Sequence, residues 1–210
     1  MSHPSASRRA RRRRALALLG TVAVASAATV AVLQAIPAAN GSVLVPTGAP
    51  IAQASYQPTS ADGFIPENGR PTVFDDTSPA VANLNRELLD ALRAAAERAE
   101  RDGVELRVNS GWRAPEYQQW LLDNATAEYG SSEEAARWVA TPSTSAHVTG
   151  DAVDLGPDSA LDWLSQHGDR FGLCQIYANE RWHYELRPDA EANGCPRMYA
   201  DPTDDPRMQS

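Results

Sequence analysis

The chain contains no lysine, and its charges are distributed unevenly. All 19 basic residues are arginines, and six of these lie before residue 15, whereas all 27 acidic residues lie from Asp62 onward. The 13 arginines outside this leader leave the rest of the chain with a net charge of −14. A domain this acidic repels phosphate backbones, so we expect no nucleic-acid partner.

Cysteine is scarce, with only Cys174 and Cys195 present. Two cysteines fit a single disulfide formed in an oxidising compartment, and two free buried thiols are the alternative. A bridge between them would close a loop of about 20 residues and stabilise the fold by about 3 kcal/mol in the chain-entropy treatment.

Acidic residues are absent from the N-terminal region, which has the pattern of an export signal. Residues 1–14 form a basic segment expected to stay in the cytoplasm, and residues 15–37 are uncharged and mostly apolar. About 23 residues also suffice to cross a hydrocarbon core of about 30 Å. Small residues over 23–27 offer cleavage sites, so a cleaved signal peptide and an uncleaved membrane anchor both remain open. Either one exports the remainder of the chain.

Composition divides the rest of the chain into three parts. Residues 38–62 are rich in proline, serine, alanine and glycine and show no period, which predicts a flexible linker. Residues 63–200 are long enough for one modest core. Residues 201–210 are expected to form a disordered tail.

The strongest helical pattern begins at Ser78 and Pro79, residues favoured at a helix N-terminus. Apolar residues then recur at three- and four-residue intervals, and Gly103 is a plausible stop. These apolar positions are Val81, Leu84, Leu88, Leu92 and Ala95. The pattern predicts one helix across this region.

Three more helices and four short strands are expected. The helices cover 115–129, 132–140 and 158–166, and the second of them is capped by Ser131 with Glu134 at capping-box spacing. The strands cover 104–108, 152–155, 173–177 and 182–186. These elements predict an α+β fold with a small antiparallel sheet flanked by helices.

Histidine is also rare, and three of the four lie beyond the leader. His167 precedes Gly168 at a predicted helix end, where an imidazole interacts favourably with the last carbonyls. His147 lies in a loop rich in serine, threonine and glycine. His183 lies at the entry to the last strand.

His147, His183 and Asp154 together offer two nitrogens and one oxygen. A catalytic zinc site uses three such ligands and leaves a fourth position for water, whose pKa the metal lowers toward 7. Glu180, three residues before His183, is placed to accept the proton of that water. Each residue also has an ordinary alternative, namely a surface histidine, a carboxylate that caps backbone, or a solvated glutamate.

Three motifs resemble those of the VanY-type zinc D-alanyl-D-alanine carboxypeptidases. The segment 145–154 reads SAHVTGDAVD and is similar to the family's SxHxxGxAxD signature, with five identities fixed. Residues 180–183 read ERWH and resemble ExWH, and residues 110–118 resemble SGYRS…YQ. The departure is Trp112, where the family often carries tyrosine. The motifs spread over about residues 105–187, most of the folded part.

The resemblance implies a role for each matching residue. His147, Asp154 and His183 would hold one zinc ion, and Glu180 would be the general base. Arg113 would bind substrate and stabilise charge on the scissile carbonyl oxygen, which suits a permanently charged guanidinium. Two further residues belong to the first motif: Ser145 would bind substrate or shape the loop, and Gly150 would permit the turn between two ligands.

The implied activity is hydrolysis of the terminal D-Ala–D-Ala bond of peptidoglycan stem peptides, by a single zinc-peptidase domain over residues 63–200. Alternatives of the same fold are an L-alanyl-D-glutamate endopeptidase and an L,D-carboxypeptidase, because the motifs fix the metal and the base while the pocket fixes the substrate. A more distant alternative is a non-catalytic, metal-bearing wall-binding module. The membrane would be a partner only through an uncleaved leader. A Cys174–Cys195 disulfide would brace the half of the site that carries Glu180 and His183.

Overall fold

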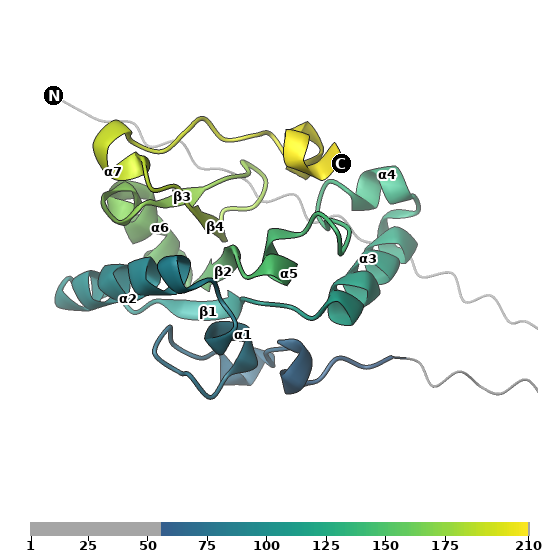
Figure 1. Cartoon of the computed structure of the whole chain (residues 1–210), viewed down its shortest axis with the longest axis horizontal. Helices are drawn as coiled ribbons and strands as arrows, with labels where there is room; N and C mark the ends of the chain where they lie inside the picture. Colours follow the sequence, from purple (N-terminus) through teal and green to yellow (C-terminus); the bar gives the residue numbers. More distant parts are fainter. Residues whose placement is uncertain (1–55, 210) are drawn as a thin grey trace, which may run out of the picture. The chain divides into compact units, whose positions relative to one another are not determined.

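The structure is a computed structural model that describes residues 56–209. The predicted leader and most of the predicted linker lie outside these residues. Within 56–209, no helix combines the length and apolarity that crossing a membrane requires. The described part is α+β with a small antiparallel sheet flanked by helices, as predicted. The structure shows that the four strands lie in the order β1-β2-β4-β3 (Figure 1).

The strands are short, and helices surround them. The strands are β1 (Arg107–Ser110), β2 (Ala152–Gly156), β3 (Leu173–Gln175) and β4 (His183–Leu186). The α-helices are α1 (Pro79–Ala82), α2 (Arg86–Arg101), α3 (Pro115–Tyr129), α4 (Ser132–Ala135), α5 (Ala146–Thr149), α6 (Asp158–His167) and α7 (Ala190–Asn193). The 3-10 helices are η1 (Ser60–Asp62), η2 (Glu67–Gly69), η3 (Gly168–Phe171), η4 (Pro202–Asp204) and η5 (Pro206–Gln209).

The two faces of the sheet have different chemistry. Because side chains alternate along a strand, Val153, Leu155 and Tyr184 share one face, and they are buried in the main core. Helices α2 and α6 contribute to the same cluster through Leu88, Leu92, Leu161 and Leu164. The opposite face carries Asp154 and His183. The apolar face therefore anchors the sheet and leaves the polar face available for a site.

Strand register places these two polar residues next to each other. Asp154 on β2 is paired directly with His183 on β4, and with Ser110 of β1 on its other side. Side chains paired across an antiparallel ladder lie about 5 Å apart at Cβ. The ladder between β2 and β4 thus brings together residues that are 29 positions apart in the sequence.

The prediction of one helix over 78–103 was wrong, because the chain breaks between α1 and α2. Asn85 caps α2 by accepting a hydrogen bond from the Glu87 amide at 3.0 Å, and its own amide donates to the Gly150 carbonyl at 2.8 Å. Gly150 passes so close that a Cβ on it would lie 2.6 Å from the Asn83 oxygen. The contact of residues 83–85 with Gly150 accompanies the break in the helix. The apolar residues keep their helical spacing across the break, so their pattern does not reveal it.

Other boundaries differ by smaller amounts. Helix α3 has the predicted bounds, and the Ser131 hydroxyl caps α4 as expected, but α4 ends at Ala135 instead of residue 140. Strand β1 begins at Arg107 instead of Val104 and includes Asn109 and Ser110, which lie beyond its predicted end at residue 108. The Asn109 side-chain amide donates to the Leu155 carbonyl on β2 at 2.8 Å. This hydrogen bond attaches a polar residue of β1 to the neighbouring strand.

Order extends beyond both predicted ends of the domain. Residues 56–62, expected in the linker, include η1, and the Ala114 amide donates to the Asp62 carbonyl at 2.9 Å. Residues 202–209, expected in a disordered tail, form η4 and η5. Their order comes from specific contacts, including two hydrogen bonds from Arg207 to Glu185. Composition does not reveal such contacts.

The predicted disulfide is present and joins Cys174 to Cys195, with Cα atoms 5.5 Å apart. Cys174 lies on the edge strand β3, and Cys195 lies in the segment that follows α7. A small second cluster, formed by Cys174, Ile176, Tyr177 and Ala190, packs beside the bridge. The disulfide therefore attaches the C-terminal segment to the sheet.

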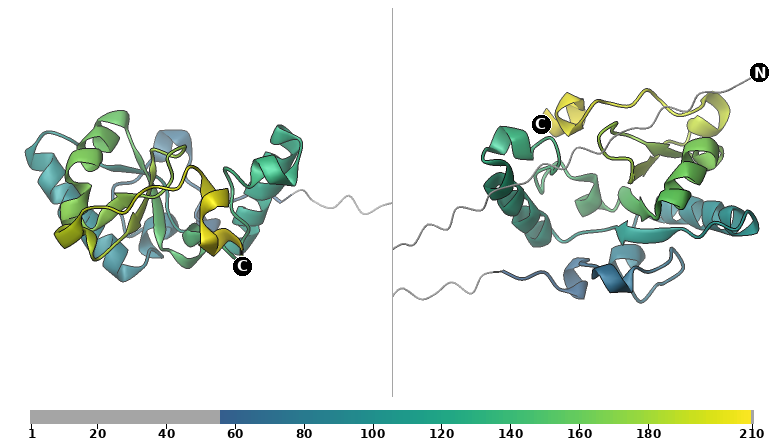
Figure 2. Two further views of the ribbon diagram at one scale, coloured as in Figure 1. Left: turned by 90° about the horizontal axis from the view of Figure 1, so that it is seen from above. Right: turned by 180° about the vertical axis from the view of Figure 1, so that it is seen from behind.

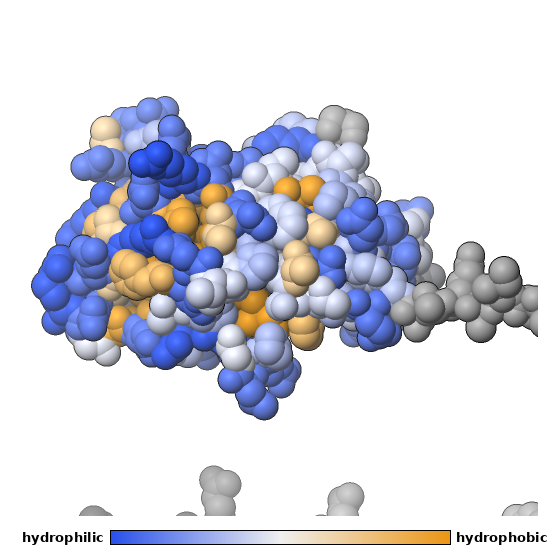
Figure 3. All heavy atoms as spheres, turned by 60° about the horizontal axis from the view of Figure 1, so that its bottom comes forward, coloured by the Kyte–Doolittle hydropathy of each residue, from blue (hydrophilic) through white to orange (hydrophobic). Residues whose placement is uncertain are grey.

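Most of the surface seen in Figure 3 is hydrophilic, with small apolar patches between charged residues. The large apolar side chains that remain exposed in the described part are Phe64, Phe74, Tyr129, Trp138, Trp182 and Met198. Tyr129 and Trp138 stack on each other, with ring centroids 6.1 Å apart. Both of them, together with Trp182, line a cleft that also contains Asp154 and His183.

Gly150→Ala should destabilise the fold more than Gly130→Ala. Both glycines have positive φ, +79° and +82°, so each substitution should cost about 1–2 kcal/mol for the left-handed conformation. Only at Gly150 would the new methyl group also strike backbone, adding about 1–3 kcal/mol. Urea unfolding of the two variants measures the difference. Equal losses would show that the close approach to Asn83 is unimportant.

Candidate metal centre

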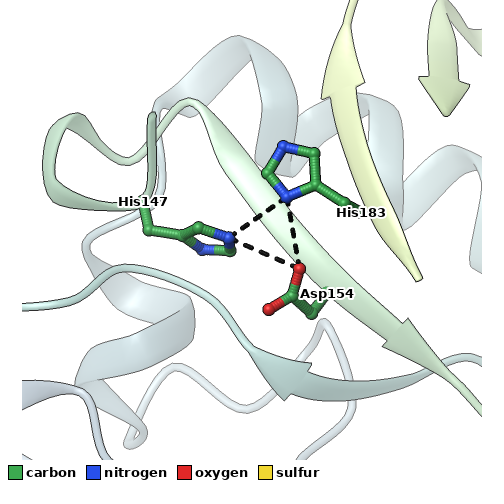
Figure 4. A group of neighbouring side chains, drawn as sticks. All are labelled: His147, Asp154 and His183. Atoms are coloured by element: carbon green, nitrogen blue, oxygen red, sulfur yellow. Dashed lines mark hydrogen bonds and ion pairs between the residues drawn. The ribbon is translucent and has the colours of Figure 1, made fainter. Parts of the chain in front are cut away.

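Three side chains from separate elements converge on one point (Figure 4). His147 comes from the single turn α5, so it lies on a short helix instead of the predicted loop. Asp154 and His183 come from β2 and β4. His147 Nε2, His183 Nδ1 and Asp154 Oδ1 are separated by 3.3, 3.3 and 3.4 Å, the longest distance being from His147 to Asp154.

These distances fit a tetrahedral metal ion. Zinc bonds of about 2.0–2.1 Å at tetrahedral angles place two donor atoms about 3.3–3.4 Å apart. Two imidazole nitrogens and one carboxylate oxygen are also a donor set that zinc accepts, with one position left open. The triangle therefore has the size and chemistry of a three-ligand zinc site.

Each imidazole is held by its other nitrogen. His147 Nδ1 lies 2.8 Å from the Gly111 carbonyl oxygen, which can only accept a hydrogen bond. His183 Nε2 lies 3.2 Å from Oε1 of Glu185. When only these two nitrogens carry protons, the lone pairs of His147 Nε2 and His183 Nδ1 are directed at the shared point.

One oxygen of Asp154 accepts a hydrogen bond, and the other has only the longer ion-pair contacts with the two histidines. Its Oδ2 accepts a hydrogen bond from Arg113 Nη2 at 2.8 Å, whereas its buried Oδ1 makes no hydrogen bond within the described residues. A buried carboxylate oxygen without a donor is costly. The oxygen faces the two imidazole lone pairs, and a cation there would satisfy all three.

Charge and burial shift the pKa of each ligand. Burial would raise the pKa of Asp154, but His147, His183 and Arg113 outweigh it and hold the pKa well below its ordinary value. Burial, together with the charge of Arg113, lowers the pKa of His147. Burial lowers the pKa of His183, but contacts with Asp154 and Glu185 outweigh it and raise the pKa to about 9. Metal binding must therefore displace a proton from His183.

Glu180 lies beside the triangle but does not complete it. It belongs to the turn between β3 and β4, and its Oε2 is 3.9 Å from His183 Nδ1. The residue is buried and lines the cleft. Burial raises the pKa of its carboxyl to about 7. A carboxyl group that exchanges a proton near neutral pH next to a metal site is suited to general acid–base chemistry.

Arg113 makes contacts that the sequence did not indicate. Besides Asp154, it donates from Nε to Ser110 Oγ at 2.7 Å and from Nη1 to Gln118 Oε1 at 3.1 Å. Gln118 is buried and donates in turn to the Ala140 carbonyl at 2.9 Å. Arg113 therefore orients a ligand carboxylate while also lining the cleft.

The triangle opens into a cleft of about 350 Å³. Ser145, which is buried at the N-cap of α5, lies on its wall together with Arg113 and Glu180. Aromatic and apolar residues form the rest, including Tyr129, Trp138, Trp182 and Met208. All the residues predicted for the metal, the base and the substrate thus lie around one cavity.

Sequence reasoning missed Glu185, Gln118 as a partner of Arg113, and the C-terminal Arg207. The sequence could have predicted Glu185, because residues two apart on a strand share a face and His183 is two positions earlier. Arg207 had no such signal, because its proximity depends on the path of the chain after α7. His167 lies outside the site, with its ring centroid 4.9 Å from that of Trp163.

Comparison with known sequences defines the family. A sequence model described as VanY, D-alanyl-D-alanine carboxypeptidase, matches residues 81–189, more than half of the chain. The chain belongs to this family. The matched region contains all three metal-site residues together with Arg113 and Glu180.

Individual relatives match over part of their length. A D-alanyl-D-alanine carboxypeptidase of Enterococcus faecalis (strain ATCC 700802 / V583) is 36% identical over 124 residues, covering 47% of this chain and 44% of the relative. The putative carboxypeptidase YodJ of Bacillus subtilis (strain 168) is 34% identical over 121 residues, covering 50% and 44%. The chain thus spans less than half the length of these curated relatives. The solved structure of the LdcB LD-carboxypeptidase shares the fold, with a TM-score of 0.51, 24% identity, and coverage of 67% of this chain and 74% of that one.

Zinc should stabilise the protein through this triangle. At a free zinc concentration about 100 times the dissociation constant, the free energy of unfolding should rise by about 2.7 kcal/mol, and a chelator should reverse the change. Thermal unfolding with and without zinc measures it. His183→Ala should abolish the response, whereas His167→Gln should retain it because His167 lies outside the site. An undiminished response in His183→Ala would place the metal elsewhere.

Glu180 should also make the stability of the metal-free protein depend on pH. Its folded pKa of about 7 exceeds the ordinary value of 4.5, so the folded state binds this proton more tightly. That contribution is fully present below about pH 4.5 and is lost as the pH rises through about 7. Glu180→Gln should therefore match the parent at about pH 4 and exceed it at about pH 8, by about 1–3 kcal/mol. Urea unfolding in chelator measures both, and a difference independent of pH would contradict the shift.

Proposed function

We propose that this protein is a zinc-dependent peptidase that hydrolyses the terminal D-Ala–D-Ala bond of peptidoglycan stem peptides. The observation that carries the proposal is the triangle of His147, Asp154 and His183 at metal-binding distances, with the buried, non-ligating Glu180 beside it. Membership of the VanY family supports the choice of substrate.

His147, Asp154 and His183 would hold the zinc ion. When bound, zinc supplies a Lewis acid that makes water a nucleophile near neutral pH and polarises a carbonyl oxygen. The protein contributes the orientation of the three ligands through Gly111, Glu185 and Arg113. These outer contacts determine which ligand atoms face the metal.

Glu180 moves the proton. Its carboxylate accepts a proton from the attacking water and later gives it to the departing amine nitrogen, so one group serves as base and then as acid. Burial favours this role, because a pKa near 7 allows the group to hold and release a proton at neutral pH. Its position outside the ligand triangle leaves both of its oxygens available.

Arg113 and Ser145 would act on the substrate. The Arg113 guanidinium keeps its charge and lines the cleft, so it can stabilise negative charge on the scissile carbonyl oxygen while holding Asp154 in place. Ser145 presents a hydroxyl on the cleft wall next to α5, where it can hydrogen bond with the peptide.

The proposed place of action is outside the cytoplasmic membrane. The arginine-rich residues 1–14 and the apolar residues 15–37 support export, as either a cleaved signal peptide or an anchor, with the zinc-peptidase domain on the outer side. The disulfide between Cys174 and Cys195 agrees with an oxidising compartment.

Replacing Glu180 should separate catalysis from metal binding. In Glu180→Gln and Glu180→Ala, turnover of a pentapeptide stem ending in D-Ala–D-Ala should fall by about 10²–10⁴-fold, while each chain keeps its zinc. Mass analysis of the products and metal analysis of the protein measure the two quantities. Glu97→Gln, an exposed substitution on α2, is the matched control and should keep full activity.

The same assay distinguishes the related activities. Loss of one alanine from the pentapeptide supports the proposal. Release of D-alanine from the tetrapeptide alone would indicate an L,D-carboxypeptidase, and cleavage inside the stem would indicate an endopeptidase. A zinc-loaded protein that cleaves neither peptide would be a binding module, and nearly full activity in Glu180→Gln would remove Glu180 from the mechanism.

A further inference from the structure

The C-terminal segment runs along the β3 side of the sheet, where the Tyr199 amide donates to the Ile176 carbonyl at 3.0 Å, and ends near α4 (Figures 1 and 2). It begins after α7, is bridged to β3 through Cys195, and continues through η4 and η5. Arg137 donates to Asp201 at 2.9 Å, which attaches the segment to the region after α4. Residues 205–207 lie beyond the part of the chain that matches the VanY family, which ends at residue 189.

Arg207 of this segment binds Glu185, the carboxylate that holds His183. Its Nη1 donates to Glu185 Oε2 at 2.7 Å, and its Nη2 donates to Oε1 at 3.1 Å. Oε1 is the oxygen that faces His183 Nε2, at 3.2 Å. Two parallel bonds from a planar guanidinium fix the plane of a carboxylate as well as its position.

A second arginine near Glu185 does not do the same. Arg187 donates to Oε2 at 2.8 Å, and among the hydrogen bonds of the described residues it makes none to Oε1. Arg187 alone would leave the carboxylate free to turn about that single contact. Arg207 supplies the hydrogen bond to Glu185 Oε1, the oxygen that faces His183 Nε2.

Arg207 is in turn held by Asp205, a fully buried residue. Its Nε lies 3.1 and 3.0 Å from the two Asp205 oxygens, and Asp205 Oδ2 also accepts a hydrogen bond from the Tyr177 hydroxyl at 3.0 Å. The Tyr177 ring lies 5.1 Å from the His183 ring, between centroids. Two neighbours of His183, namely Glu185 at its Nε2 and Tyr177 beside its ring, are thus connected to the same two C-terminal residues.

We propose that Asp205 and Arg207 form a C-terminal clamp that positions the metal ligand His183 through Glu185. Arg207 is a positioning residue, since it acts on the site through Glu185 and not on the substrate. The clamp keeps Glu185 paired with His183 Nε2, and this pairing keeps the Nδ1 lone pair directed at the metal. Without Arg207, the buried carboxylates of Glu185 and Asp205 would repel each other, and Glu185 would turn toward Arg187 and away from His183.

This inference rests on the proposed zinc site, and zinc affinity of the full chain tests it directly. Competition with a chromophoric chelator gives the dissociation constant. Arg207→Gln should raise it by about 10–100-fold, the effect usual for partners of a ligand histidine. Arg197→Gln is the matched control, because Arg197 is an exposed arginine of the same segment that makes no bond to Glu185 or Asp205 among the described contacts, and its affinity should stay unchanged.

Two further variants separate positioning from folding. Arg207→Lys keeps a charge beside Asp205 but cannot make the paired bonds, so it should fold and still bind zinc several-fold more weakly. In a Glu185→Gln background, Arg207→Gln should add little further loss, because the effect passes through Glu185. The visible spectrum of the cobalt-substituted protein should change in Arg207→Gln and Arg207→Lys and remain unchanged in Arg197→Gln.

The outcomes distinguish the two proposals. If the parent chain binds zinc and folded Arg207→Gln or Arg207→Lys binds it equally well, the clamp is refuted and the zinc site stands. If Arg207→Gln does not fold, the Arg207→Lys result decides. If the parent chain binds no zinc, the proposed site and the clamp fail together.

Discussion

The pairing of β2 with β4 is the constraint on which the site depends. Asp154 and His183 are paired directly across this ladder, so backbone hydrogen bonds between the strands determine the distance between two of the three proposed ligands. Val153, Leu155 and Tyr184 anchor the register from the other face, because a slip by one residue would move them into the cleft and the ligands into the core. The energy that stabilises the core therefore also holds the ligand geometry.

Buried charge on the polar face is tolerated because each carboxylate has a cationic partner. Arg113 pairs with Asp154, and Arg207 pairs with both Glu185 and Asp205. Glu180 has no arginine partner among the described residues and only a 3.9 Å contact with His183, and burial raises its pKa to about 7. Buried carboxylates with and without an arginine partner therefore have different roles. Carboxylates paired with arginine stay ionised and hold geometry, whereas the carboxylate without such a partner can exchange a proton.

Local signals in the sequence predicted much of this arrangement. The helix over 115–129, the class of fold and the disulfide followed from capping residues, apolar periods and a cysteine pair. The residues around the cleft followed from the resemblance of three motifs to those of the VanY family. The break at Asn83–Asn85 did not follow, because it depends on Gly150, which lies 65 residues after Asn85. The structured ends at 56–62 and 202–209 were missed for a related reason. Their composition is that of a loop, and their order comes from contacts such as that between Arg207 and Glu185.

The cleft is built from two sources with different freedom to vary. The proposed ligands and Glu180 belong to the strands, α5 and the turn before β4, where neighbouring strands and the core restrict replacement. Much of the remaining wall comes from α3, the residues around α4 and the C-terminal segment, through side chains such as Tyr129, Trp138 and Met208 that lie away from the main core. Substitutions in this wall can therefore change which ligand the cleft accepts with little loss of core packing, while the proposed ligands and Glu180 keep their positions.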